Sequence, residues 1–201
     1  MPPPGRLGRP GGRRPILHTM APLSPSDADA VRAVLDGRID VFAVLVRRYQ
    51  DVLYAHAVRM VGSPDDAADL VQRAFVKGFE RLDRCAEPDR VGGWLFRIVA
   101  NQCRDHLKSR RRKDLSVDSL PPLRASEPTP DAEARDAELR RRVDAALDQL
   151  DPDQREAFVL KHVDGRPYDE MSALLGVSVS ALKMRVHRAR EGLQTILEAY
   201  R

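Results

Sequence analysis

The chain has 201 residues, of which 42% are apolar and 32% charged, with a formal net charge of +4 and an isoelectric point of about 9.3. This composition can bury a core, but the 15 prolines and the abundant charge favour two small domains joined by a linker over one large compact domain. Because arginine and lysine gather in particular stretches, local positive fields make nucleic acid a candidate partner.

The first 24 residues are rich in proline, glycine and arginine and lack the apolar stretch of a signal peptide, so we expect a disordered basic tail at 1–24. Two readings of this tail stay open: it is an arm that binds nucleic acid, or translation starts at Met20 and not at Met1. Composition favours the second. No stretch of the sequence has the length and apolarity expected of a membrane span.

The two cysteines, Cys85 and Cys103, do not show the spacing of a paired motif, which favours a reducing, cytoplasmic setting over a disulfide framework. Cys103 and His106 lie three residues apart and would face the same side of a helix. Two ligands fall short of the four that structural zinc needs, so we expect a packed thiol and a surface imidazole and no metal site.

From Ser26 onward, apolar residues recur at three- and four-residue steps and predict two amphipathic helices that break near Gly37. A third helix is predicted to begin after Ser63 as N-cap, with Pro64 in its first turn. A loop at 83–93, with one proline and two glycines, then separates this helix from the next. The buried stripe of the third helix is expected to contain Leu70, Val71, Ala74, Phe75 and Phe79.

The next helix, at 94–113, combines an apolar stripe with seven basic residues and one acid, Asp105. We expect the stripe to pack in the core and the basic side chains to lie off it. A solvated charged face normally mixes in acids, so phosphate binding is the favoured interpretation of these charges. The stripe consists of Leu95, Ile98, Val99, Cys103 and Leu107.

Residues 114–135 contain prolines, small residues and acids without a periodic apolar face and are predicted to form a flexible linker. Beyond the linker, a helix is predicted with Asp151 as its N-cap. The C-terminal run then has the order of a helix-turn-helix motif, with a short helix, a turn at Gly176 and Ser178 capping a longer helix. Plain helical hairpins share this pattern, but a second basic helix at 94–113 strengthens the case for DNA binding.

Three stretches resemble the polymerase-binding and promoter-reading regions of bacterial sigma factors, in particular the small extracytoplasmic-function group. They are DDAADLVQRAFVKGFERLD, GGWLFRIVANQCRDHLKSRRR and LDQLDPDQREAFVLKHVDGRPYDEMSALLGVSVSALKMRVHRARE. The resemblance runs from about Val41 to Leu197, apart from the linker. It implies an all-α fold with two small helical domains, region 2 at 25–113 and region 4 at 136–201, joined by the flexible linker.

The resemblance also implies a function: a dissociable subunit that binds core RNA polymerase and directs promoter-specific initiation. Region 2 would recognise and melt the minus-ten element, and region 4 would bind the minus-thirty-five element. The implied partners are promoter DNA, the clamp helices of the largest polymerase subunit and the flap of the second-largest subunit, with an anti-sigma factor as an optional partner. No cofactor and no catalytic activity are implied.

Site residues carried over from the family fall into three groups. The implied polymerase contacts are Asp69, Leu70, Gln72 and Phe75, of which Leu70 and Phe75 also fit a purely core role. The implied minus-ten residues are Trp94, Arg97, Asn101, Arg104, Lys108, Arg110, Arg111 and Arg112, together with the loop at 83–93. The implied minus-thirty-five residues are Ser180, Lys183, Met184, Arg185 and Arg188. For Trp94, packing at the start of an amphipathic helix is favoured over base stacking.

Two other classes of protein compete with this reading. A helix-turn-helix repressor or activator explains the C-terminal motif but leaves the stretch DDAADLVQRAF and the basic helix at 94–113 without a role. An enzyme is the least favoured class, because the sequence lacks a Gly-rich phosphate loop, a His/Cys/Asp constellation and a nucleophile motif.

Overall fold

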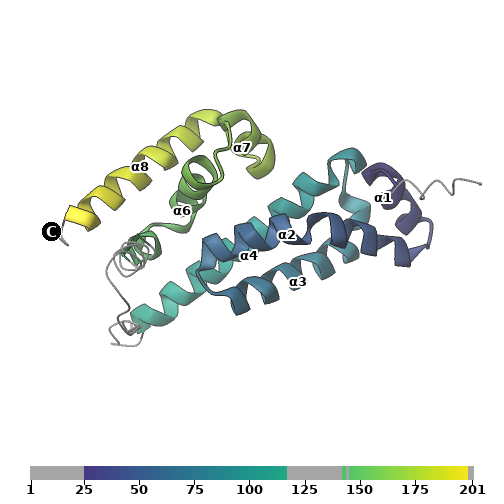
Figure 1. The fold of residues 1–201 in the computed structure, drawn as a ribbon, viewed down its shortest axis with the longest axis horizontal. Helices are drawn as coiled ribbons and strands as arrows, with labels where there is room; N and C mark the ends of the chain where they lie inside the picture. The colour runs from purple at the N-terminus through teal and green to yellow at the C-terminus, as the bar shows by residue number, and fades with distance from the viewer. Residues whose placement is uncertain (1–24, 117–141, 144, 199–201) are drawn as a thin grey trace, which may run out of the picture.

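The computed structural model describes residues 25–116, 142–143 and 145–198. Every regular element within these ranges is helical, which confirms the predicted all-α fold (Figure 1). The predicted tail at 1–24 and nearly all of the predicted linker at 114–135 lie outside the described residues.

Four helices form what we call the N-terminal bundle: α1 (Asp27–Leu35), α2 (Phe42–Val61), α3 (Pro64–Glu80) and α4 (Val91–Ser116). In Figure 1, α2, α3 and α4 lie side by side, and α1 sits at one end of them. The predicted break between the first two helices is confirmed at Gly37, whose φ of 97° is a left-handed conformation that glycine adopts without strain. Short 3-10 turns at 82–84 and 88–90 make up most of the loop between α3 and α4.

Helix α3 begins as its sequence predicts. The Ser63 hydroxyl accepts a hydrogen bond from the backbone N–H of Asp66 at 3.3 Å, and Pro64 occupies the first turn. The side-chain oxygen satisfies one of the N–H groups that a helix leaves unpaired at its start. Of the predicted stripe of α3, all members are buried except Phe79, which is 40% exposed, so the expectation that Phe79 is buried was wrong. Phe79 lies at the edge of the α2–α3 pair, where its ring packs edge-on against Phe42.

The remaining helices form what we call the C-terminal unit: α6 (Pro152–Phe158), a π-helical turn (Val159–Val163), α7 (Tyr168–Leu175) and α8 (Val179–Glu198), preceded by helical residues at 145–149. Asp151 caps α6 by accepting from the backbone N–H of Asp153 at 2.9 Å, as predicted. Helix α7 ends at Gly176, whose φ of 68° allows the sharp turn into α8.

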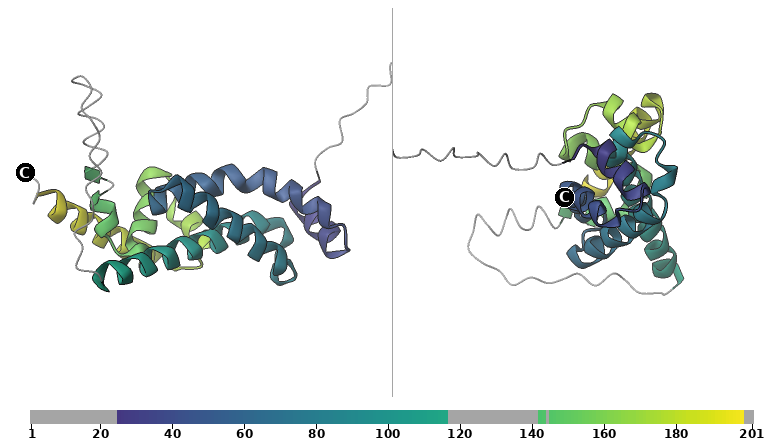
Figure 2. Two further views of the ribbon diagram at one scale, coloured as in Figure 1. Left: turned by 90° about the horizontal axis from the view of Figure 1, so that it is seen from below. Right: turned by 90° about the vertical axis from the view of Figure 1, so that its right-hand side faces the viewer.

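The C-terminal unit packs directly on the N-terminal bundle. It lies beside α4, while α1 lies at the other end of the bundle (Figure 2). One continuous apolar core contains residues of both parts, including Phe96 and Val99 of α4 and Leu160 and Met171 of the C-terminal unit. A smaller core joins the helical residues at 145–149 and Leu150 to α8. The helices that the sequence assigns to two domains therefore share a buried interface in this arrangement.

Candidate nucleic-acid interfaces

The C-terminal unit contains the helix-turn-helix motif that the sequence predicts. Gly176 closes α7, and the Ser178 hydroxyl accepts a hydrogen bond from the backbone N–H of Ala181 at 3.3 Å, which caps the start of α8. The buried residues Met171, Leu175, Leu182 and Val186 hold the two helices together from the inside. This packing leaves the opposite face of α8 available for contacts outside the unit.

The exposed face of α8 carries most of the residues predicted to read duplex DNA. These residues are Ser180, Lys183, Met184 and Arg188, and the side chain of Met184 is 51% exposed. Lys183 lies over the ring of Tyr168, with its Nζ 5.8 Å from the ring centre. Arg185 differs from the others, because its side chain is only 28% exposed and lies 3.7 Å from Asp153 of α6.

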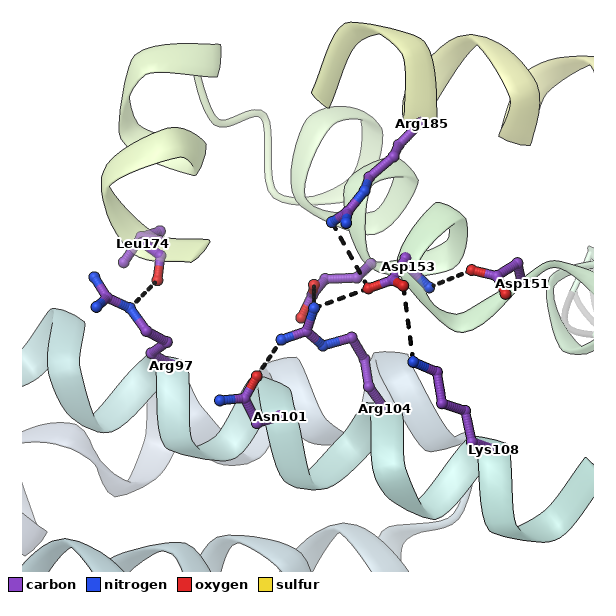
Figure 3. Close-up of polar contacts among 9 residues, drawn as sticks. Arg97, Asn101, Arg104, Lys108, Asp151, Asp153, Leu174 and Arg185 are labelled. Carbon is purple, nitrogen blue, oxygen red and sulfur yellow. Dashed lines mark hydrogen bonds and ion pairs between the residues drawn. The ribbon is translucent and has the colours of Figure 1, made fainter. Parts of the chain in front are cut away.

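The predicted core stripe of α4 is confirmed, with Leu95, Val99, Cys103 and Leu107 buried and Ile98 partly buried. On the other side of α4, Arg97, Asn101, Arg104 and Lys108 follow one another at three- and four-residue steps and form a line along the helix (Figure 3). We call these four residues the basic line. Residues three and four apart are neighbours on a helix surface, so the four side chains lie next to one another.

The basic line lies off the core stripe, as expected, but the C-terminal unit covers part of it. Arg97, Asn101 and Lys108 are exposed, whereas the Arg104 side chain is only 16% exposed. Arg97 donates to the backbone carbonyls of Leu174 at 3.3 Å and Ala173 at 3.1 Å, near the end of α7. Arg104 donates to Asp153 at 2.8 Å and also to the side-chain oxygen of Asn101. The C-terminal unit supplies acids that the sequence of α4 lacks, and a count of acids within 94–113 could not show them.

Further along α4, the contacts with the C-terminal unit continue. The Nζ of Lys108 lies 3.8 Å from Asp153. Arg111 donates to the carbonyl of Asp148 at 3.0 Å and to the carbonyl of Leu150. Arg110 and Arg112, in contrast, are exposed. Trp94 is partly buried against the core, near Gly78 of α3, in line with the packing role favoured from the sequence.

Asp153 and Glu156 of α6 give this contact its electrostatic character. Burial acts to raise the pKa of Asp153, but the hydrogen bond from Arg104 and the charges of Arg185 and Lys108 lower it overall. Glu156 is fully buried, and burial raises its pKa to about 7, although Arg104 at 3.6 Å favours the charged form. Among the described residues, neither oxygen of Glu156 accepts a hydrogen bond, so desolvation outweighs the ion pair.

A second group of buried polar side chains joins the two parts near α2. The imidazole of His56 is 1% exposed, packs at a tilt of 46° against Phe96 with ring centres 4.5 Å apart and lies 3.9 Å from Asp164. Burial lowers the pKa of His56, despite the opposing effect of Asp164. Arg59 pairs with Asp164 at 2.7 Å, and Arg155 donates to the carbonyl of Arg59 at 3.2 Å.

The residues predicted to contact polymerase divide into two kinds. Asp69 and Gln72 are exposed on α3, and Asp69 pairs with Arg73 at 2.7 Å. Leu70 and Phe75 are 3% and 8% exposed, so they belong mainly to the core.

Beside the exposed residues of α3, α2 and α3 line an open apolar groove of about 710 Å³. The sequence prediction missed its α2 side. The groove is lined mainly by Phe42, Val46, Tyr54, Val71, Gln72, Phe75, Val76 and Phe79. Tyr54 and Val76 are 38% and 54% exposed, an unusual state for large apolar side chains that would otherwise belong in a core. The sequence did contain a signal for this groove, because the apolar residues of α2 spread over more of the helix surface than one core-facing side needs.

No cluster of three or more metal-ligating side chains occurs within the described ranges. Cys103 is fully buried, and His106 faces Asp66 at 3.9 Å. None of the helices in the part of the chain that the structure describes is long and apolar enough to cross a membrane.

Comparisons with known proteins agree with this architecture. The family model for Sigma-70 region 2 matches residues 45–113, and the model for Sigma-70, region 4, matches residues 140–193. The chain is 35% identical to the ECF RNA polymerase sigma factor SigE of Mycolicibacterium smegmatis, covering 87% of this chain and 70% of that protein. It is also 35% identical to the RNA polymerase sigma factor CnrH of Cupriavidus metallidurans, covering 88% and 98%.

Solved structures extend the likeness to the fold. The structure of CnrH in complex with the cytosolic domain of CnrY matches with a TM-score of 0.57 and 32% identity, covering 87% of this chain and 99% of that one. The sigma factor RpoE in complex with the anti-sigma factor NepR from Bartonella quintana matches with a TM-score of 0.53 and 28% identity, covering 80% and 98%.

Proposed function

Because the chain belongs to the extracytoplasmic-function group of the sigma-70 family, and so serves promoter-directed transcription initiation, we propose that it has no catalytic activity of its own and that its two basic helices divide the work on promoter DNA. Helix α4 binds and helps to melt the minus-ten element, and α8 binds the minus-thirty-five element as duplex. The domains that do so are 25–113 and 136–201, with the linker at 114–135 between them.

The proposal for α4 rests on its basic line. A single strand needs cations for its backbone and a surface or pocket for its unstacked bases, and stacking contributes about 1–3 kcal/mol per base. Arg97, Arg104 and Lys108 provide the cations at spacings of one to two helical turns, and Asn101 between them offers an amide to an extruded base. Arg110, Arg111 and Arg112 extend the positive charge, and Trp94 with the loop at 83–93 borders its start.

The proposal for α8 rests on the motif and its exposed side chains. The second helix of a helix-turn-helix motif enters the major groove, and arginine or lysine there reads guanine edges or holds phosphates. Lys183, Met184 and Arg188 lie on the exposed face of α8, as does Ser180 near its start. Arg185 joins them once its contact with Asp153 is released.

Polymerase docking is proposed for α3 and the groove beside it. Asp69 and Gln72 would contact the clamp helices of the largest subunit directly, whereas Leu70 and Phe75 would hold α3 in position. The neighbouring apolar groove adds exposed surface of the kind that marks protein interfaces, with Tyr54 and Val76 on its rim. The C-terminal unit would meet the flap of the second-largest subunit.

Two further proposals follow from the relatives. CnrH and RpoE each form a complex with another protein, CnrY and the anti-sigma factor NepR respectively. An anti-sigma factor is accordingly proposed as a partner of this chain. We also propose that the chain works in the cytoplasm, where polymerase and promoter DNA meet.

The observation that carries the proposed division of labour is the basic line on a helix outside the helix-turn-helix motif. To test it, polymerase holoenzyme reconstituted with Asn101→Ala is compared with the parent by permanganate footprinting of bubble thymines and by gel shift of closed complexes. We expect weaker melting with closed-complex affinity retained, and partial recovery on a promoter with a pre-melted bubble. Unimpaired melting with lost closed-complex affinity would make α4 a reader of duplex DNA.

Salt dependence adds a second readout to the same experiment. Arg104→Ala and Lys108→Ala should each lower the slope of log affinity against log salt by about one unit, because each removes one phosphate contact. The matched control is Arg32→Ala, which removes an exposed arginine of α1 on a different surface and should leave the slope unchanged. Copurification with core polymerase distinguishes a sigma factor, which should copurify, from a helix-turn-helix repressor, which should not. The double variant Asp69→Ala, Gln72→Ala should copurify with core polymerase less than the parent.

A further inference from the structure

One carboxylate, Asp153 of α6, is shared by cations from both proposed DNA-binding helices (Figure 3). Arg104 of α4 lies 2.8 Å from it, Lys108 of α4 lies 3.8 Å from it, and Arg185 of α8 lies 3.7 Å from it. Glu156, one turn further along α6, lies 3.6 Å from Arg104. Asp153 thus lies beside these cations as a phosphate group would, whereas Glu156 is fully buried behind it.

The rest of the basic line is occupied in the same way. Arg97 donates to two carbonyls at the end of α7, where a helix carries negative partial charge. The side-chain oxygen of Asn101 accepts from Arg104. The Arg104 side chain is only 16% exposed, although arginine at a free DNA-binding surface is normally well exposed. Every residue of the basic line is therefore either bonded to the C-terminal unit or held by a residue that is.

Distance along DNA rules out simultaneous binding in this arrangement. The minus-ten and minus-thirty-five elements are separated by about 25 base pairs, on the order of 85 Å of B-form DNA at about 3.4 Å per pair. Arg104 and Arg185 both lie within 4 Å of Asp153, so the two DNA-binding helices face each other across one side chain. The two parts must separate before both elements can be bound.

We propose that Asp153 acts as a built-in mimic of DNA phosphate, which holds the free chain closed and competes with promoter DNA for the cations of α4 and α8. The proposal rests on the proposed function of α4. It assigns this acid a regulatory role: it suppresses DNA binding by the chain until the C-terminal unit leaves α4.

The test uses the full chain without polymerase and compares two variants of equal charge. Asp153→Asn removes the shared acid. Asp151→Asn is the matched control, because Asp151 caps the same helix two residues away, and asparagine caps helices equally well. Each variant is titrated with a fluorescent single strand and with a fluorescent duplex, and affinity is followed by anisotropy.

We expect Asp153→Asn to bind both probes about tenfold more tightly than the parent, since apparent affinity scales with the fraction of open chain, while Asp151→Asn binds like the parent. Equal affinities of Asp153→Asn and Asp151→Asn, whether both unchanged or both raised, would overturn the proposal. Should Asp153→Asn fail to fold, Asp153→Ser removes the same charge with a smaller polar side chain and has the same expected direction and the same refuting outcome.

Closure is measured separately from DNA binding. Spin labels at Glu80→Cys and Arg190→Cys, both exposed positions, report the distance between α3 and α8, and the buried Cys85 and Cys103 should not be labelled. Asp153→Asn should shift the distance distribution to longer values and Asp151→Asn should not. An unchanged distribution in both would refute closure by Asp153, whereas a shift without any DNA binding in the open chain would count against the proposed function of α4.

Discussion

Glu156 should make the free energy of unfolding of the chain fall as the pH rises. Its carboxyl is fully buried, and burial raises its pKa from 4.5 to about 7. The charged groups that face it are Arg104 and Lys108 from α4, Asp153 from its own helix and Arg185 from α8. Because the folded chain holds the proton more tightly than the unfolded chain, stability is fully present below pH 4.5 and falls as the pH rises through 7.

The expected size follows from these two pKa values. Between pH 5 and pH 8 the linkage relation gives a loss of about 2.5 kcal/mol in the free energy of unfolding from this group alone. Glu156→Gln keeps the shape of the side chain and removes its titration. Other groups, such as His56 with its lowered pKa, titrate alike in both proteins and cancel in the comparison.

Urea unfolding of the parent and of Glu156→Gln at pH 5 and pH 8 measures this contribution. The variant should lose about 2.5 kcal/mol less stability than the parent over that interval. If both proteins show the same pH dependence, the ion pair with Arg104 keeps Glu156 charged throughout, and the reasoning from burial fails.

Three further predictions concern stability and reactivity. Ser63→Ala removes the cap of α3 and should lower the free energy of unfolding by about 1 kcal/mol, measured by urea unfolding, with Ser63→Asp as a variant that retains stability. Gly92→Ala places a Cβ in steric conflict with the ring of Tyr49 and should destabilise by about 1–3 kcal/mol, seen as a lower melting temperature; an unchanged value would mean that the ring moves freely. Cys103 is fully buried, and burial raises its pKa to about 12, so Ellman's reagent at pH 8 should modify it only after unfolding; rapid reaction in the native chain would contradict this burial.

Local features of the fold were predictable from the sequence because they depend on neighbouring residues. The caps at Ser63 and Asp151, the turn at Gly176 and the buried stripe of α4 each follow from side chains within one or two helical turns. The resemblance to sigma factors added the ordered set of motifs that the family models match.

Contacts between distant parts of the chain were not predictable in this way. Arg104 and Asp153 are 49 residues apart, and no local rule pairs them. The acids of α6 were therefore absent from the account of the basic line, and the exposed apolar groove between α2 and α3 was seen only in part, since periodicity identifies an apolar face without saying whether the protein itself covers it.

The central claim is that this chain directs core polymerase to particular promoters, and run-off transcription tests it most directly. Core enzyme is incubated with genomic DNA fragments with and without the chain, and the transcript starts are sequenced. We predict new starts that share sequence elements about 10 and 35 base pairs upstream. With Lys183→Ala or Arg188→Ala, transcription from these starts should no longer depend on the element about 35 base pairs upstream. The same starts with and without the chain, in an assay where core binding is verified, would contradict the claim.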